Sequence, residues 1–143
     1  MTVVNINPNV GAKLNIAAAN LVRVHAEPDA GVVLTKAFVR SADRLGLSHT
    51  ESARILGLSR PSVSRMATGA YVLERERGKE WELASLSVRL YRSLLAIVGT
   101  DELAQSWLRG DNTELGASPI SLVLNVQGLI QVVQYLDAYR GRL

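Results

Sequence analysis

The sequence predicts an all-α fold, and three observations carry this prediction. Apolar residues recur at helical spacing in one segment after another, capping residues stand between the segments, and no run resembles a strand bounded by hairpin turns. With 143 residues, 48% of them hydrophobic and 20% charged, the chain is long enough to bury a core, and this composition excludes wholesale disorder. We expect one helical domain, or two small helical units that share a core.

Residues 1–30 are predicted to form an N-terminal arm or helix. Residues 1–11 are rich in asparagine and glycine, as in a loop, whereas the alanine-rich segment from Ala12 to His25 is suited to a helix. A break is expected at residues 27–31. The apolar face of the helix would consist of Leu14, Ala17, Ala18, Leu21 and Val22.

A helix is predicted from Val32 to Leu45, and Gly46 ends it. Phe38, the only phenylalanine of the chain, is expected in the core behind the segment that follows. The residues at helical spacing on the predicted inner face are Val33, Ala37, Phe38, Ala42 and Leu45.

Residues 49–66 predict two short helices that meet at a tight turn. Ser48 or Thr50 can cap the first helix, and Glu51 lies in its first turn. Gly57 can adopt the positive φ of a helix end, and Ser59 can cap the second helix. The predicted buried residues are Ala53, Leu56, Leu58, Val63 and Met66, and Pro61 is expected in the first turn of the second helix.

The second of these helices is predicted to expose hydrogen-bond donors suited to phosphates and base edges, namely Arg60, Ser62, Ser64 and Arg65. Residues 36–79 carry nine basic and four acidic side chains, a net charge of +5, whereas residues 80–143 carry −2. The positive charge of the chain therefore coincides with this segment, as a nucleic-acid footprint would. A plain helical hairpin with a solvated basic face is the alternative.

Four further helices are predicted after a charged linker at residues 74–80. They run from Trp81 to Val98, Asp101 to Arg109, Ser118 to Leu124 and Leu129 to Tyr139, with breaks at Gly99, at residues 110–117 and at residues 125–128. In the last helix, Ile130, Val133 and Leu136 are expected to be buried. The apolar face of the first is wide enough for burial between two partners, and a dimer interface is one candidate.

Catalytic, cofactor and metal sites are not predicted. Cysteine is absent, and His25 and His49 have no close carboxylate partners in the sequence, so neither a disulfide nor a zinc site is expected. The sequence contains no nucleophile with a base and no phosphate-binding loop at recognisable spacing, so we expect no enzymatic activity. The chain start lacks a signal-peptide pattern, and no stretch approaches the ~20 apolar residues of a membrane span, which predicts a soluble cytoplasmic protein.

The chain resembles known families in both halves. Residues 49–66 resemble the helix-turn-helix of the Xre and Cro group, although Ser52 stands where the pattern usually has an aliphatic residue. The second half looks like the C-terminal domain of antitoxins of the Xre, MbcA and ParS type. The residues that carry this second resemblance are Trp107, Leu108, Asn112, Leu115, Gly116, Pro119, Ile120, Leu122, Val123, Gly128 and Leu136.

The resemblance implies an antitoxin of a bacterial type II toxin–antitoxin system. Such a protein would form a homodimer, bind a cognate toxin of the RES-domain kind, and repress its own operon by binding operator DNA. RES toxins resemble ADP-ribosyltransferases, and they consume NAD or, in some members, modify a target protein. The implied domains are a helix-turn-helix at residues 31–72 and a dimerisation and toxin-binding domain at residues 73–143.

The C-terminal end of the chain is the expected site of toxin contact, through Tyr135, Tyr139, Arg140 and Arg142. These residues offer an aromatic surface and forked donors for an acidic pocket residue. A solvated basic terminus is the alternative interpretation. A stand-alone helix-turn-helix regulator would fit the first half equally well, and only residues 107–136 separate it from an antitoxin.

Overall fold

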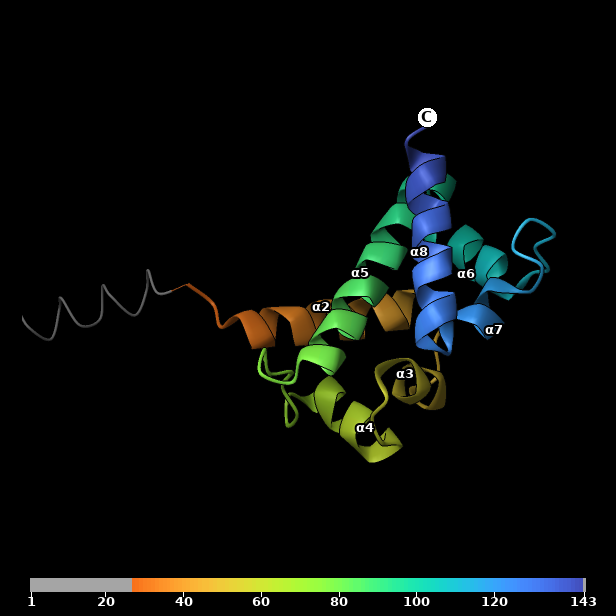
Figure 1. Ribbon diagram of the computed structural model, residues 1–143. Helices are drawn as coiled ribbons and strands as arrows, with labels where there is room; N and C mark the ends of the chain where they lie inside the picture. The colour runs from red at the N-terminus through yellow and green to blue at the C-terminus, as the bar shows by residue number, and fades with distance from the viewer. Residues whose placement is uncertain (1–26, 143) are drawn as a thin grey trace, which may run out of the picture.

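The computed structural model describes residues 27–142, which form seven α-helices and no strand, so the predicted all-α class is confirmed. No single helix in this range is both long enough and apolar enough to cross a membrane, and the helices Gly78–Val98 and Asp101–Arg109 meet both conditions only when taken together, as a pair bent by 109°. The helices are α2 (Ala30–Arg44), α3 (His49–Leu56), α4 (Arg60–Thr68), α5 (Gly78–Val98), α6 (Asp101–Arg109), α7 (Pro119–Val123) and α8 (Val126–Arg140) (Figure 1). The predicted helix from Ala12 to His25 lies outside the described residues.

The long helix α5 lies at the centre of the fold. It packs against α2 and α3 on one side and against α6 and α8 on the other, and α8 runs beside it over most of its length (Figure 1). Neighbours within the same chain therefore account for the wide apolar face of this helix. A dimer interface on it stays a prediction. Its buried apolar residues include Leu83, Ala84, Val88, Leu90 and Leu94.

The start of α2 differs from the predicted break at residues 27–31. Asp29 caps the helix, and its carboxylate accepts a hydrogen bond from the backbone N–H of Gly31 at 2.8 Å. Ala30 and Gly31 thus belong to the first helical turn, and the prediction was wrong for them. The reason is a close approach, because a Cβ on Gly31 would lie 2.2 Å from the carbonyl oxygen of Leu73.

The start of α8 differs in the same way from the predicted break at residues 125–128. Asn125 caps this helix, and its side-chain oxygen accepts from the backbone N–H of Gly128 at 2.8 Å. A Cβ on Gly128 would lie 2.0 Å from the carbonyl oxygen of Leu122. The glycine therefore permits the close crossing of α7 and α8 instead of the tight turn that we expected.

Two aliphatic residues predicted to be buried are exposed. Val33 has 51% of its surface exposed and Ile130 has 39%, whereas Phe38, Val133 and Leu136 are buried as predicted. The buried face of α2 and that of α8 are each narrower than the row of apolar residues in the sequence, and Val33 and Ile130 lie outside these faces.

Side chains of α6 hold the second half of the chain against the first. The guanidinium of Arg109 donates two hydrogen bonds to the carboxylate of Glu51 on α3, at 3.1 and 2.8 Å, and a third to the carbonyl of Gly46 at 2.9 Å. The side-chain amide of Gln105 donates to the carbonyl of Arg44 at 2.9 Å. A two-point carboxylate contact of this kind fixes orientation as well as distance.

The ion pair between Glu51 and Arg109 predicts a defined pH dependence of stability. The hydrogen bonds from Arg109 lower the pKa of Glu51 from 4.5 to about 2, so the stabilisation is complete above about pH 4.5 and is lost as the pH falls towards 2. Glu51→Gln keeps the helix cap and removes the charge. We expect it to lower the free energy of unfolding by about 1 to 2 kcal/mol at pH 7, a value reduced because Arg109 is partly exposed.

Urea unfolding of the wild type and Glu51→Gln at pH 7, 4 and 2.5 measures this difference. It should shrink as the pH falls. A difference of equal size at all three values would show that the charge of Glu51 contributes nothing.

The close crossing at Gly128 predicts a second stability effect. Gly128→Ala places a methyl group against the backbone of Leu122 and should lower the free energy of unfolding by about 2 kcal/mol through forced separation of α7 and α8. Gly78→Ala is the matched control, since nothing lies within 4 Å of its Cβ. Thermal unfolding of both variants tests the prediction, and equal melting temperatures would contradict it.

Candidate functional site

The turn between α3 and α4 has the geometry that the sequence predicted. Ser48 caps α3, and its hydroxyl accepts from the backbone N–H of Glu51 at 3.0 Å while the Glu51 carboxylate accepts from the backbone N–H of Ser48 at 2.9 Å. Gly57 ends α3 with a φ of 68°, and Ser59 caps α4. Gly57 and Ser59 fix the two ends of the turn and so the direction in which α4 leaves it, while the reciprocal cap of Ser48 and Glu51 fixes the start of α3.

The inner face of this helical pair is packed as expected. Leu56, Val63 and Met66 have 1 to 5% of their surface exposed, and Leu58 is half-buried against the same core. With its apolar side held in this way, α4 presents its opposite side to solvent.

Three of the four predicted DNA-contacting residues lie on the exposed side of α4, namely Arg60, Ser64 and Arg65. The expected exposure of Ser62 was wrong, because only 9% of its surface is exposed. Its hydroxyl lies 2.8 Å from the hydroxyl of Ser59 and accepts a hydrogen bond from Arg65 at 3.2 Å. Ser62 therefore supports the cap of α4 and orients Arg65, while Arg60, Ser64 and Arg65 form the outward face.

The sequence reasoning missed Thr68, which is exposed at the end of the same helix. It follows Ser64 by four residues and Arg65 by three, so it lies on their face of α4. Its hydroxyl donates to the carbonyl of Arg65 at 3.1 Å and keeps two lone pairs for other donors. Helical spacing from Ser64 would have found it.

A second surface lies at the other end of the molecule, where three aromatic side chains of α6 and α8 form a row. Trp107 stacks on Tyr135 with ring centroids 6.3 Å apart and planes at 15°, and Tyr135 contacts Tyr139 with the same centroid separation and a tilt of 36°. We call these three residues the aromatic row. Trp107 and Tyr135 are half-buried and Tyr139 is 43% exposed, so the row leads from the core to solvent.

An acidic group lies beside the aromatic row. Burial and then the carboxylate of Glu114 raise the pKa of Tyr135 above its usual value of 10. Asn112 shapes the loop that carries Glu114, since its side chain accepts from the backbone N–H of Leu115 at 3.1 Å. Asn112 and Glu114 were not among the predicted contact residues, because only the fold brings residues 112–114 next to Tyr135.

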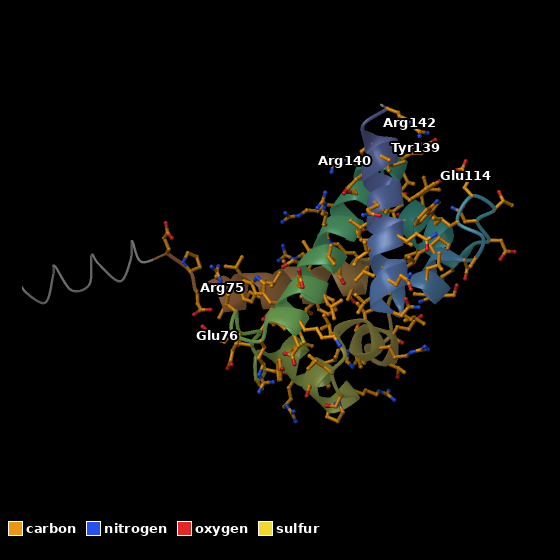
Figure 2. The ribbon with its side chains drawn as sticks, viewed as in Figure 1. Arg75, Glu76, Glu114, Tyr139, Arg140 and Arg142 are labelled. Atoms are coloured by element: carbon orange, nitrogen blue, oxygen red, sulfur yellow. The ribbon has the colours of Figure 1, made fainter. Side chains whose placement is uncertain are left out.

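The four predicted toxin-contacting residues are divided between two sides of α8. Tyr139 and Arg142 lie on the side of Glu114, whereas Arg140 lies towards α5 (Figure 2). Arg140 is 3.4 Å from the hydroxyl of Ser93, which in turn donates to Asp137 at 3.1 Å. Arg140 thus joins a polar group between α5 and α8, and the outward surface consists of the aromatic row and Arg142.

Neither surface offers an evident metal site. Within residues 27–142 no group of three or more histidine, aspartate and glutamate side chains converges closely enough to hold an ion.

A helix-turn-helix joined through one long helix to a helical domain with an aromatic outer surface defines a two-part binding protein. Comparison with family models shows what the two parts are. Residues 24–89 match the antitoxin Xre-like helix-turn-helix domain, and residues 93–142 match the antitoxin Xre/MbcA/ParS C-terminal toxin-binding domain. A comparison with the curated proteins found no match.

The chain belongs to the Xre/MbcA/ParS-type antitoxin family, as both domains stand in order over most of its length. It is the antitoxin component of a toxin–antitoxin system. Its C-terminal domain implies a cognate toxin as partner, and its helix-turn-helix is of a kind that binds DNA.

Proposed function

We propose that this antitoxin neutralises a RES-domain toxin, an ADP-ribosyltransferase-like enzyme that consumes NAD, by covering it with the aromatic row and Arg142. The observation that carries the proposal is the stacking of Tyr135 on Trp107, which leads to the exposed ring of Tyr139. Rigid aromatic side chains beside an arginine are the usual anchors of tight protein interfaces. Arg142 adds a forked donor for an acidic residue of the toxin.

The antitoxin is also proposed to repress its own operon as a homodimer. Arg60, Ser64 and Arg65 would contact operator DNA, with Ser62 holding Arg65 in place. Two-fold symmetry of the dimer would require a palindromic operator whose half-sites lie about one helical turn apart. A catalytic role is not part of the proposal.

A stand-alone transcription regulator is the second candidate, since it would use α4 in the same way. The match of residues 93–142 to a toxin-binding domain favours the antitoxin. A neighbouring gene that encodes a RES-like protein would favour the antitoxin over the stand-alone regulator, and a search of the adjacent DNA is enough to find one.

Operator binding gives the first functional prediction. Arg65→Ala should weaken binding to the DNA upstream of the chain's own gene by about 1 to 3 kcal/mol, the usual contribution of one good base contact. Fluorescence anisotropy at a fixed salt concentration measures the loss, because phosphate contacts make affinity depend on salt.

Arg92→Ala is the matched control, since Arg92 is an exposed arginine on α5 and not on α4, the helix proposed to contact DNA. Unchanged binding by Arg65→Ala would remove this residue from the DNA-contacting face. Toxin neutralisation should survive the change, because it uses the other end of the molecule.

Neutralisation gives the second functional prediction. When the neighbouring gene product is expressed alone, cells should lose viability and NAD, and co-expression of the full chain should restore both. Tyr139→Glu should weaken toxin binding by about 2 kcal/mol or more, because it places a charge in the centre of the proposed interface. Gln134→Ala, an exposed residue of α8 off this face, should rescue as well as the wild type.

A point variant tests this surface better than a chain that ends before Leu129, which would also lose the buried residues Leu129, Val132 and Leu136. Equal rescue by Tyr139→Glu and Gln134→Ala would exclude the aromatic row as the contact. Toxicity without loss of NAD would keep the antitoxin assignment and exclude NAD consumption as the activity of the toxin.

A further inference from the structure

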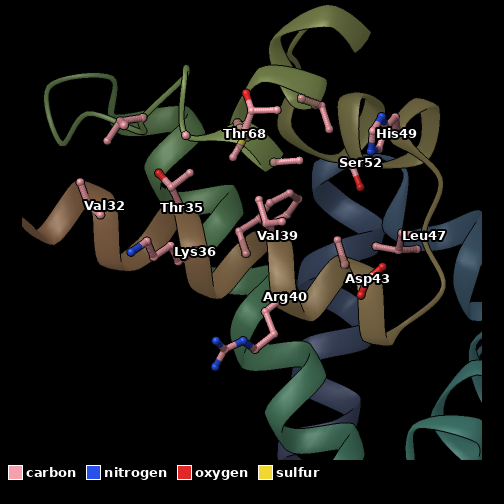
Figure 3. Close-up of a pocket in the computed structure, with 17 residues that line it drawn as sticks. Val32, Thr35, Lys36, Val39, Arg40, Asp43, Leu47, His49, Ser52 and Thr68 are labelled. Carbon is pink, nitrogen blue, oxygen red and sulfur yellow. The ribbon is translucent and has the colours of Figure 1, made fainter.

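A groove of about 630 Å³ runs along α2 on its side facing α3 and α4, and Thr68 at the end of α4 lies on its rim (Figure 3). Its apolar lining includes the buried side chains of Phe38, Val63 and Met66, together with Val39 and Val72. The groove is open to solvent, and polar side chains such as Lys36, Arg40 and Asp43 surround its apolar floor. An apolar surface with a polar rim is typical of a docking site.

The shape of the groove suits a helix. Val32 and Asp43 line it at opposite ends of α2 (Figure 3). At a rise of 1.5 Å per residue, this stretch of α2 is about 17 Å long. A second helix lying along α2 would fill such a hollow with one face of aliphatic side chains.

The residues before Asp29 join α2 at the Val32 end of the groove, since Asp29 is the cap of this helix. The segment from Ala12 to His25 would be about 21 Å long as a helix, close to the length of the groove. Its Leu14, Ala17, Ala18, Leu21 and Val22 share one face, and Pro28 stands in the short connection to α2.

We propose that the segment from Ala12 to His25 docks in this groove as an amphipathic helix antiparallel to α2 of the same chain. A short connection between two helices favours antiparallel neighbours. The docked segment would complete the apolar core behind α4, the helix that carries the proposed DNA-contacting residues. The proposal does not depend on the proposed toxin or operator.

An antiparallel register also matches side chains along the two helices. Counting back from the connection, Lys13 comes beside Asp43, which is exposed at the far end of the groove. The small residues Ala17 and Ala18 come over the middle, near Val39, where they permit a close approach. Charge and size therefore agree with the same register.

A second copy of the chain, or a segment of the toxin, would also meet an apolar groove. The chain's own segment has the advantage of its tether, because a short linker gives an effective concentration in the millimolar range. Both other occupants can be recognised in the experiment.

A cysteine pair tests the docking directly, since the chain has no cysteine of its own. Full-length chain with Ala17→Cys and Val39→Cys is oxidised at low concentration. Ala17→Cys with Val33→Cys is the control, because Val33 lies on α2 outside the groove and is 51% exposed. Mass spectrometry and non-reducing gels then separate links within one chain from links between two.

We expect the groove pair to form a link within one chain at least about tenfold faster than the control pair, because disulfides require Cβ atoms within a few ångströms. Equal rates for the two pairs, or no link in either, would overturn the proposal. A link that joins two chains would overturn docking within one chain and assign the groove to a second copy.

A second measurement covers the case in which the cysteines disturb the groove. Leu21→Glu in the full chain should lower the melting temperature by about 5 °C, whereas Asn20→Glu, off the apolar face, should not. In a chain that already carries Val39→Glu, Leu21→Glu should add little, because both changes remove the same contact. Fully additive effects would show that Leu21 does not occupy the groove.

Discussion

Burial of α5 is the constraint on which the rest of the structure depends. Ala84 and Leu94 of this helix are fully buried, and the helices that cover them come from both halves of the chain. Neither half could keep this apolar surface from water alone, since each burial of a large aliphatic side chain contributes about 2 kcal/mol. The two family matches meet near the middle of α5, so the homologous domains are joined by a shared core element and not by a flexible linker.

The link between Arg109 and Glu51 adds orientation to this shared core. Glu51 belongs to the cap of α3, and Arg109 ends α6, which also carries Trp107 of the aromatic row. A partner that shifts α6 would therefore act on the cap that sets the start of the helix-turn-helix. The physical route from one surface to the other includes a two-point ion pair and two backbone contacts, at Gly46 and Arg44. Such a route can transmit a structural change only if α6 has two positions. Because Arg109 of α6 lowers the pKa of Glu51, a shift of α6 on toxin binding would change that pKa.

The helices could be predicted from the sequence because their ends are determined by interactions between residues close in sequence. Gly57, Ser59 and Gly99 act on backbone groups within a few residues, and the structure has each of them in the expected place. The error at Gly31 has its origin in a contact between residues distant in sequence. Gly31 lies in a helix because α2 approaches Leu73, and no local pattern reports that approach. The candidate sites differ in the same respect. The helical spacing of α4 was enough to predict that Arg60, Ser64 and Arg65 are exposed on one side. The stacking of Trp107 on Tyr135 could not be predicted, because it depends on how α6 and α8 meet. The burial of Ser62 follows from its contact with the cap residue Ser59, which an assignment by helix face alone overlooks.

Helix α8 contributes one face to the core and a neighbouring face to the outward surface. Val132 and Leu136 are buried against the fold, while Tyr135 and Tyr139 follow one another by four residues on the side of the aromatic row. The position of Tyr139 is thus set by the packing of Leu136, three residues before it, and by the contact of its ring with Tyr135, so the ring would need little further ordering on binding a partner. Low ordering cost is what lets a small aromatic surface bind tightly. A partner that binds the aromatic row would therefore require a folded chain, because Tyr135 stacks on Trp107 only while α6 and α8 are packed together.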